Sequence, residues 1–387
     1  MFLAVWRFRR ALLAQFAGPR DTFGRLAPRF ARCQTTRNRS RHGACNAFSP
    51  APVPSPDRAH RAGRRAVTRT PPAEWARHKA VWIGFPSHPE LWQDDLDQAR
   101  HEVAAFARAV DAEGRGEKVL LVAADAEAGV AAASLAPFAE VVVEPFGDIW
   151  LRDTATIVTG DGTVRDFAFN GWGGKYDLPG DEDIGARLAR RRGKRIVPCD
   201  WVLEGGALDG DGTGLVVTTE QCLLNPNRNG LIGKAEIEER LERDLGYDRV
   251  LWLGDGLLND HTDGHVDNLA RFVGEGRLAI PVAAENDPNW QVYQQAAERA
   301  RAFGVTVIPV PSPGRVMRDD EIVPASYMNF YIGNASVVVP VYGAPDDQAA
   351  VQQFQALFPD RKVIGLRADA ILTGGGSFHC ISQQIPG

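Results

Sequence analysis

One pattern recurs about five times between residue 75 and the end of this 387-residue sequence, and it limits the possible folds more than any other feature. In each copy, two stretches rich in β-branched and aromatic residues flank a turn that contains glycine, and a helix-like stretch and a short apolar run follow. The candidate hairpins are residues 154–169, 205–224, 266–282 and 327–341. The helix-like stretches are residues 96–114, 236–246, 289–304 and 346–360, and the apolar runs are 118–123, 249–254, 305–310 and 362–366. Because no linker interrupts the repeat, we predict one closed α/β array rather than two domains.

The composition excludes several other classes of protein. With 44% hydrophobic and 24% charged residues, the chain is neither collagen-like nor a coiled coil nor disordered throughout. Beyond the first dozen residues, no run approaches the ~20 consecutive apolar residues of a membrane-spanning helix, so we expect no membrane contact. The net charge is −5, but residues 1–70 carry 15 Arg, no Lys and two Asp, so the remaining 317 residues carry −18. An acidic body suits a cationic ligand and repels the phosphates of nucleic acids.

Residues 1–66 differ from the rest of the chain. They are rich in Arg, poor in acidic residues, and have no sustained helix or strand period. We interpret them as a disordered extension translated from codons upstream of the true start, because no second Met precedes Met317 and Val67 could serve as a non-ATG start. An organelle transit peptide and a twin-arginine export signal near Arg9 are the alternatives. We expect residues 67–387 to form a single catalytic domain.

The five cysteines are odd in number and lack CxxC spacing, so the sequence predicts neither a disulfide framework nor a zinc ribbon. A reducing compartment is the simpler interpretation, and we expect a cytoplasmic protein. Cys380 follows the stretch TGGGSFH, whose glycines can bring backbone close to a ligand, and we interpret it as a nucleophile. Cys199 and Cys222 lie in apolar, strand-like surroundings, so we expect them to be structural.

Two motifs offer carboxylates. In DIWLRD, a strand would place Asp148, Trp150 and Arg152 on one face, with Asp153 at its end on the other. A surface strand with an Asp–Arg ion pair is the plainer interpretation of this motif. Further along, Glu204 lies in the apolar stretch DWVLEGGAL, where a carboxylate is costly to bury unless it is paired or functional. We take Glu204 as a site carboxylate, with a solvated turn residue as the alternative.

The stretch NDHTDGHVDN is dense in ionisable groups. His265 and Asp267 stand two residues apart at the head of the predicted strand HVDNLARFV, so their side chains are expected on the same side. Such a pair suits acid–base chemistry and cation binding. His261, Asp263 and His265 could instead be metal ligands, and a metallohydrolase stays open as an alternative. Against a metal, the chain has only eight His and no second His cluster.

Residues 209–220, DGDGTGLVVTTE, fit the ligand spacing of a calcium-binding EF-hand loop. The flanks disagree with it, because LVVTT is extended and no helix precedes Asp209. We therefore predict an ordinary hairpin turn at this place.

Several long strings occur together and in a fixed order: PAEWARHKAVWIGFP, DIWLRDT, NGWGGKYD, LEGGALDGDGTGLVVTTEQCLLNPNRN, NDHTDGHVDNLARF and GGGSFHCISQQIP. The set closely resembles the agmatine deiminase and bacterial-type peptidylarginine deiminase family over about residues 72 to 386. The resemblance implies a five-bladed, pseudo-symmetric, pentein-like α/β propeller with the site at its centre, and a homodimer. After WLRD this chain reads TATIV where the family would have TGP, which affects substrate choice rather than the chemistry.

The resemblance also implies roles for individual residues. Cys380 would be the nucleophile, His265 the general acid and base, and Glu204 the acid that orients that His. Asp153 and Asp267 would bind the substrate guanidinium. No cofactor and no metal would be required.

We also assign Trp150 to substrate binding. The expected reaction is hydrolysis of agmatine to N-carbamoylputrescine and ammonia through a covalent thiouronium on Cys380, with free arginine or peptidyl arginine as the alternative substrate. Carboxylates near Cys380 should raise the pKa of its thiol, so the bound cationic substrate would assist its ionisation. Two other classes are kept as minor hypotheses: a metal-dependent hydrolase, and a non-catalytic binder whose basic tail contacts nucleic acid.

Overall fold

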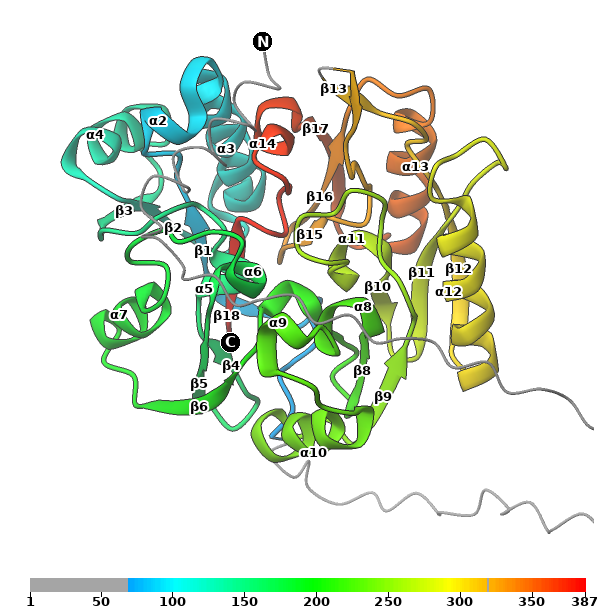
Figure 1. Cartoon of the computed structure of the whole chain (residues 1–387). Helices are drawn as coiled ribbons and strands as arrows, with labels where there is room; N and C mark the ends of the chain where they lie inside the picture. The colour runs from blue at the N-terminus through cyan, green and yellow to red at the C-terminus, as the bar shows by residue number, and fades with distance from the viewer. Residues whose placement is uncertain (1–68, 319) are drawn as a thin grey trace, which may run out of the picture.

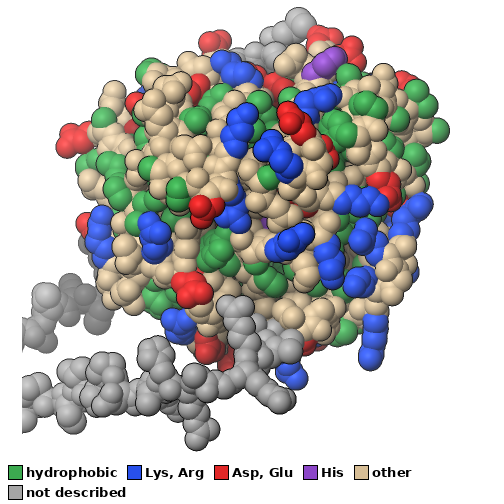
Figure 2. Space-filling model, turned by 180° about the vertical axis from the view of Figure 1, so that it is seen from behind, with side chains coloured by type: hydrophobic (Ala, Val, Ile, Leu, Met, Phe, Trp, Pro, Cys, Tyr) green, Lys and Arg blue, Asp and Glu red, His purple; other side chains and the backbone are tan. Residues whose placement is uncertain are grey.

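The computed structural model describes residues 69–318 and 320–387, so the expectations for residues 1–66 lie outside the described part. In this part, no helix has both the length and the apolar character needed to cross a bilayer. The face seen in Figure 2 mixes acidic, basic and apolar side chains, as expected of a surface in contact with water.

The predicted repeat is present as four three-stranded sheets that share one pattern. In each, two strands pair antiparallel as a hairpin, and a third joins the second strand in parallel. The first two of these sheets contain β4 (Ile157–Val158), β5 (Val164–Ala168) and β6 (Ile196–Val202), then β7 (Asp209–Gly210), β8 (Leu215–Thr218) and β9 (Arg249–Trp252). The other two contain β10 (Arg271–Gly274), β11 (Arg277–Val282) and β12 (Thr306–Pro311), then β15 (Tyr331–Ile332), β16 (Ser336–Val341) and β17 (Lys362–Arg367). The hairpin β7–β8 lies where the calcium-loop spacing occurred, so the prediction of a plain hairpin is confirmed.

A fifth sheet is assembled from both ends of the described chain, in the order β18-β1-β2-β3. Its strands are β1 (His78–Gly84), β2 (Lys118–Ala123), β3 (Glu140–Val143) and β18 (Ser382–Pro386). β18 is antiparallel to β1, and the other neighbours are parallel. The last strand of the chain thus completes the first sheet, directly after Cys380. A small two-stranded sheet, β13 (Met317–Arg318) with β14 (Glu321–Ile322), stands apart from this pattern.

Long helices cover the outside, and short ones lie toward the middle (Figure 1). The long helices are α3 (Leu96–Asp111), α4 (Ala126–Leu135), α7 (Ile184–Arg191), α10 (Lys234–Leu245), α12 (Trp290–Phe303) and α13 (Asp347–Leu357). The short ones toward the middle include α5 (Leu151–Thr154), α6 (Gly171–Gly174), α9 (Pro226–Asn229) and α11 (Val266–Leu269). The remaining short elements are α2 (Pro89–Trp92), α8 (Glu220–Leu223), α14 (Asp369–Thr373) and the 3₁₀ turns at Gln93–Asp95, Ala112–Gly114 and Gly205–Ala207.

Helix α3 shows how the core supports the middle of the molecule. Its buried positions Ala99, Val103, Phe106 and Val110 recur at helical spacing and form one apolar face. The ring of Phe106 stacks on Phe378, with 4.8 Å between the ring centroids. The segment that leads to Cys380 is therefore fixed against a buried helix.

Two motifs predicted as strands are short helices, so those two predictions were wrong. Residues 151–154 of DIWLRD form α5, and residues 266–269 form α11 just before β10. Local polar contacts favour these turns over strands. The carboxylate of Asp148 accepts hydrogen bonds from its neighbouring backbone N–H at Ile149 and from the Trp150 indole, and the Thr262 hydroxyl accepts one from the backbone N–H of His265.

Candidate active site

Three of the predicted residues meet over the backbone of Gly206. A Cβ atom added to this glycine would lie 2.6 Å from Nδ1 of His265, 2.8 Å from Oδ1 of Asp153 and 3.1 Å from Oδ2 of Asp267. No side chain fits in that space, so only glycine allows this approach. The three side chains come from α5, α11 and the residue preceding α11. The residues lie close together, as the sequence predicts, but two short helices bring them together and not the alternation of side chains along strands.

Cys380 joins this group from the C-terminal segment. Its Sγ lies 3.5 Å from Oδ2 of Asp267, and the thiol is buried. Cys380 and Asp153 both line a cavity of about 910 Å³. Burial, together with the negative charges of Asp267 and Asp153, raises the pKa of the Cys380 thiol well above its ordinary value. The unliganded site therefore favours the neutral thiol.

Asp153 is held by two N–H donors. The indole of Trp172 donates to its Oδ2 at 2.9 Å, and the backbone N–H of Gly206 donates to its Oδ1 at 2.9 Å. Burial and the nearby charges of Asp267 and Glu204 nevertheless raise the pKa of Asp153 well above its usual range. This carboxyl group therefore gains its charge most readily when a cation arrives.

Asp267 is charged, in contrast to Asp153. Burial alone would raise the pKa of Asp267, but a hydrogen bond of 2.7 Å from Nδ1 of His379 and the attraction to that residue lower it overall. Nε2 of His379 is bonded in turn to Glu74 at 2.8 Å. The other oxygen of Asp267, Oδ1, is buried and has no hydrogen-bond partner in the described part of the chain. It is available to an N–H group of a ligand.

His265 is fully buried, and burial lowers its pKa to about 3. The imidazole is therefore neutral near pH 7. Among the described residues, neither of its ring nitrogens has a hydrogen-bond partner, and Nδ1 lies 3.6 Å from Oδ1 of Asp153. A neutral ring with a free nitrogen can accept a proton.

Glu204 is paired with a cation instead of with the His. Both of its oxygens accept from Nε of Arg228, at 2.8 and 3.0 Å. Arg228 also donates to Asp263 and to the carbonyl oxygen of Thr262. The expected action of Glu204 on His265 is therefore not a direct hydrogen bond in this state, although the two residues lie in one cluster.

The metal-ligand set suggested by the sequence is not assembled. In the described part of the chain, the group of His, Cys and acidic residues with ligand atoms within 4.8 Å of one another is Glu204, Cys222 and His265, not His261, Asp263 and His265. Asp263 is bound by Lys175 and Arg228, and Glu204 by Arg228. Cys222 is fully buried against an apolar core cluster on one side, but Glu204 and His265 are also its neighbours, so its surroundings are less apolar than the sequence predicted.

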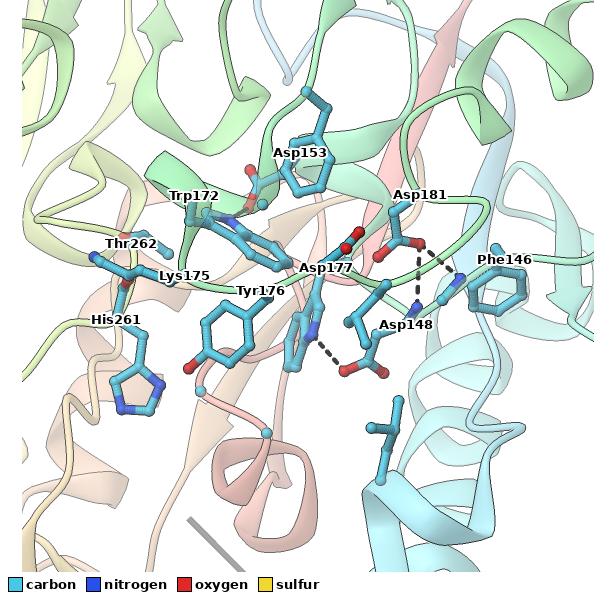
Figure 3. Close-up of a pocket in the computed structure, with 18 of the residues that line it drawn as sticks. Phe146, Asp148, Asp153, Trp172, Lys175, Tyr176, Asp177, Asp181, His261 and Thr262 are labelled. Carbon is cyan, nitrogen blue, oxygen red and sulfur yellow. Dashed lines mark hydrogen bonds between the residues drawn. The ribbon is translucent and has the colours of Figure 1, made fainter. Parts of the chain in front are cut away.

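The cavity that Cys380 lines is surrounded by aromatic and acidic side chains, several of which are labelled in Figure 3. Its wall includes the predicted Trp150, whose indole donates to Asp148 at 2.9 Å. Aromatic side chains that line it are Phe146, Phe169, Trp172 and Tyr176, and acidic ones beyond Asp153 are Glu90, Asp148, Asp177, Asp181 and Glu182. The basic groups in the lining are Lys175, His88 and His261. The excess of carboxylates matches a ligand with more than one positive charge.

Two of the acidic residues that line the cavity, Asp148 and Asp181, are joined by a hydrogen bond. Oδ1 of Asp181 accepts N–H groups from Gly147 at 2.8 Å and Asp148 at 3.1 Å. Its Oδ2 is buried without a hydrogen-bond partner among the described residues. Burial and the charge of Asp148 raise the pKa of Asp181 to about 8. Figure 3 shows both carboxyl groups beside the cavity.

Sequence reasoning missed several residues of the site. Trp172 stood inside the string NGWGGKYD but received no role. His379 adjoins Cys380, and Glu74 lies near the start of the described chain, yet their pairing depends on the way both ends meet. Only the dipeptide HC offered a signal for His379.

Comparisons with known proteins agree with these observations. A model of the Porphyromonas-type peptidyl-arginine deiminase family matches residues 70–386. The agmatine deiminase of Stutzerimonas stutzeri (strain A1501) is 36% identical over 356 residues, which cover 81% of this chain and 95% of that protein. The structure of the agmatine deiminase of Enterococcus faecalis superposes with a TM-score of 0.76 at 30% identity, over 82% of this chain and 95% of that one. The agmatine deiminase of C. jejuni gives 0.74 at 26% identity, over 81% and 95%.

Proposed function

The chain belongs to the Porphyromonas-type peptidyl-arginine deiminase family, and on that premise we propose that it hydrolyses agmatine to N-carbamoylputrescine and ammonia. The observation that carries the proposal is a thiol and a carboxyl group, Cys380 and Asp153, in the wall of an acidic cavity, with the carboxylate of Asp267 and the neutral imidazole of His265 buried next to Asp153. A planar cation with N–H groups on both edges fits between the carboxylates of Asp153 and Asp267.

Binding of the guanidinium prepares the nucleophile. In the free site, burial and the acidic groups Asp267 and Asp153 oppose ionisation of Cys380. The bound cation neutralises Asp153 and Asp267, so the thiol loses its proton more easily, and neutral His265 accepts it. Activation is thus assisted by the substrate, as the sequence analysis expects.

The reaction then proceeds in two displacements at the guanidinium carbon. The Cys380 thiolate adds to this carbon, the protonated His265 gives its proton to the departing nitrogen, and ammonia leaves with its electron pair. The product of this half is a thiouronium bonded to Cys380. Neutral His265 next takes a proton from water, whose oxygen adds to the same carbon. The C–S bond then breaks with its electron pair on sulfur, the remaining hydroxyl proton passes to solvent, and the neutral ureido product is released.

The carboxylates of the site suit a reaction in which a thiolate adds to a cation. Addition of a thiolate to a cation creates no oxyanion, so carboxylates that hold the cation serve better than an array of N–H donors. Glu204 acts on His265 through the field of the buried group it forms with Arg228. We retain Glu204 as a positioning residue and Trp150 as part of the wall against which the substrate chain packs.

The far end of the substrate decides between agmatine and arginine. Free arginine would need a cation for its carboxylate, and Arg152 and Arg228 were the candidates from the sequence. Arg152 is buried and paired with Glu74, and Arg228 is buried and paired with Glu204. The unpartnered oxygen of Asp181 instead suits the ammonium group of agmatine.

The family premise also extends to architecture and assembly. The five sheets, each with an antiparallel pair followed by a parallel neighbour, support a five-bladed propeller with the site at its centre. Three unpaired cysteines in the described residues support a reducing, cytoplasmic setting. The acidic charge of the body supports the proposal that the protein binds no nucleic acid. A homodimer is proposed from the family resemblance alone.

The direct test compares ammonia release from agmatine, free arginine and an arginyl peptide at equal concentrations. Agmatine is expected to give a kcat/KM at least about tenfold above that of the other two, a difference of about 1.4 kcal/mol. Faster release from the peptide would move the chain to the alternative substrate class.

A further inference from the structure

We propose that Asn329 is a catalytic residue whose side-chain amide stabilises the thiolate of Cys380. Nδ2 of Asn329 lies 2.9 Å from Sγ of Cys380, and the amide is buried. Asn329 lies just before β15, in a segment 51 residues from Cys380 in the sequence. Nothing in the sequence motifs pointed to it.

The orientation of the Asn329 amide is fixed by its other contacts. Its Oδ1 accepts the backbone N–H of His379 at 3.0 Å and that of Cys380 at 3.2 Å. An amide turned by 180° would place its NH₂ against these two donors, so the NH₂ must face the sulfur. Nδ2 also donates to Oδ1 of Asn268 at 2.9 Å, which holds the second N–H.

Asn268 is fixed in turn. Its Nδ2 donates to Asp260 at 3.2 Å, and its backbone carbonyl accepts the hydroxyl of Ser326 at 2.6 Å. The donor is therefore in place before substrate binds, and no reorganisation is needed when charge develops on the sulfur.

The surroundings of Cys380 explain why such a donor matters. Asp267 lies 3.5 Å from the sulfur, and it and Asp153 both disfavour a thiolate. The Asn329 amide and a backbone group of Ser377 act in the opposite direction. An N–H bond to an anion is stronger than one to a neutral sulfur, so the Asn329 contact favours ionisation.

The end of the reaction gives Asn329 a role that the substrate cannot fill. The guanidinium can assist when the thiolate first forms. When the C–S bond breaks, the organic product is a neutral urea at that end, and the sulfur leaves as an anion beside two carboxylates. The Asn329 amide still faces it at this step, until protonated His265 returns the proton. This inference rests on the proposed use of Cys380 as nucleophile.

The test measures the thiol itself and needs no substrate. The rate of alkylation of Cys380 by iodoacetamide is followed against pH by mass spectrometry of the peptide that contains it, for the full chain and for Asn329→Ala. We expect the apparent pKa of the thiol to rise by about one to two units in the variant, as for loss of a hydrogen bond to a charged group. An unchanged apparent pKa in a folded Asn329→Ala protein overturns the proposal.

A second variant covers the case in which Asn329→Ala does not fold. Asn329→Asp keeps an oxygen for the two backbone N–H groups but replaces the donor by an acceptor, so the apparent pKa should rise still further. The same apparent pKa as wild type in Asn329→Asp would show that the sulfur does not depend on this group. Asn334→Ala is the matched control, because Asn334 lies in the turn of the same hairpin, away from the sulfur. Its side chain exchanges two hydrogen bonds with the backbone of His78, and its backbone N–H donates to Glu117. Its thermal stability is expected to fall with no shift in the thiol pKa.

Activity separates chemistry from mere loop support. If Asn329→Ala acts through the pKa, its kcat/KM for agmatine should recover toward that of wild type as the pH rises above the new pKa. A loss that persists at all pH values, with an unshifted alkylation profile, would assign Asn329 a structural role only. Absence of agmatine turnover in wild type, with the alkylation shift present, would refute the proposed substrate and leave this inference standing.

Discussion

Asp153 and Asp267 both approach Gly206 but differ in their charge when the site is empty. Burial and neighbouring acids favour the protonated form of Asp153, whereas His379 keeps Asp267 ionised. Asp153 therefore ionises when a cation binds, whereas Asp267 is ionised before binding. A site with two permanent anions here would repel the thiolate more strongly, so the difference serves both binding and catalysis.

Replacement of these acids tests their role in binding the cation. Asp153→Asn or Asp267→Asn exchanges a charged acceptor for an amide whose NH₂ opposes the guanidinium donors. Each substitution should lower kcat/KM, and the fall should correspond to a loss of about 3 kcal/mol of transition-state stabilisation, as expected when one partner of a buried charge pair is removed.

Asp263→Asn is the comparison for that measurement. Asp263 binds Lys175 and Arg228 at the edge of the site, so its loss should have a much smaller effect. An active Asp153→Asn enzyme beside an inactive Asp263→Asn enzyme that zinc restores would support the metallohydrolase instead.

The raised pKa of Asp153 predicts that agmatine binding releases protons. In the free Cys380→Ser variant, the raised pKa of Asp153 favours its protonated form, whereas a bound guanidinium favours its carboxylate form. Calorimetry in buffers of different ionisation enthalpy should show release, and the release should shrink as pH rises and Asp153 is already ionised. The Cys380→Ser, Asp153→Asn double variant should release fewer protons. Proton uptake on binding would contradict the assignment.

Residue types were easier to predict from the sequence than their partners. An acid in an apolar stretch and a Cys after a glycine-rich loop mark Glu204 and Cys380 without any knowledge of the fold. The pairing of Glu204 with Arg228, and that of His379 with Glu74, join residues 24 and 305 positions apart. Local sequence contains no signal for such contacts, because packing decides them.

At the scale of elements, short helices place the chemistry. α5 and α11 each make about one turn, and each begins after a segment held by side-chain contacts to backbone. Four residues are too few to reveal a helical period, and each motif adjoins a strand-like apolar run, so the sequence predicted strands there. The long amphipathic helices and the hairpins, in contrast, contain enough residues for their periods to be read correctly.

The loops that contain Asp148 and Asp181 are joined by a hydrogen bond, and Asp181 gives a prediction about the ammonium end of agmatine. Asp181→Asn keeps the oxygen that binds the backbone N–H groups of Gly147 and Asp148, but it removes the carboxyl group that can ionise when an ammonium group binds. The KM for agmatine should rise about tenfold, or about 1.4 kcal/mol, with kcat little changed.

Butylguanidine, which lacks the ammonium group, is the control substrate for this variant. Its KM should be the same for Asp181→Asn and wild type. Equal increases for both substrates would mean that the substitution disturbs the cavity as a whole rather than an ammonium site.

At the scale of the whole molecule, the last strand completes the first sheet. The antiparallel pairing of β18 with β1 accompanies the contact of His379, the neighbour of Cys380 in the sequence, with Glu74. The site is therefore assembled from segments at both ends of the described chain. A repeat of hairpins and helices in the sequence predicts the units, but the order β18-β1-β2-β3 depends on this long-range pairing, and no local pattern announces it.

Removal of residues 1–66 tests the sequence-based interpretation of that segment. It has neither an apolar period nor acidic residues to balance its Arg content, so deletion should leave kcat/KM for agmatine and the melting temperature nearly unchanged. Truncation beyond Glu74 is the opposing control, because Glu74 pairs with Arg152, Arg271 and His379. Failure of the shorter deletion to fold would refute the interpretation.

The central claim is that Cys380 forms a covalent bond to the guanidinium carbon of agmatine. It is tested most directly by mass spectrometry of the acid-quenched enzyme during turnover. The account predicts a mass increase equal to the thiouronium on the peptide that contains Cys380, and neither adduct nor ammonia in Cys380→Ser. Cys222→Ser should retain the adduct and lose only stability. Turnover of agmatine by Cys380→Ser above about a hundredth of the wild-type rate, or an adduct located on another residue, would contradict the account.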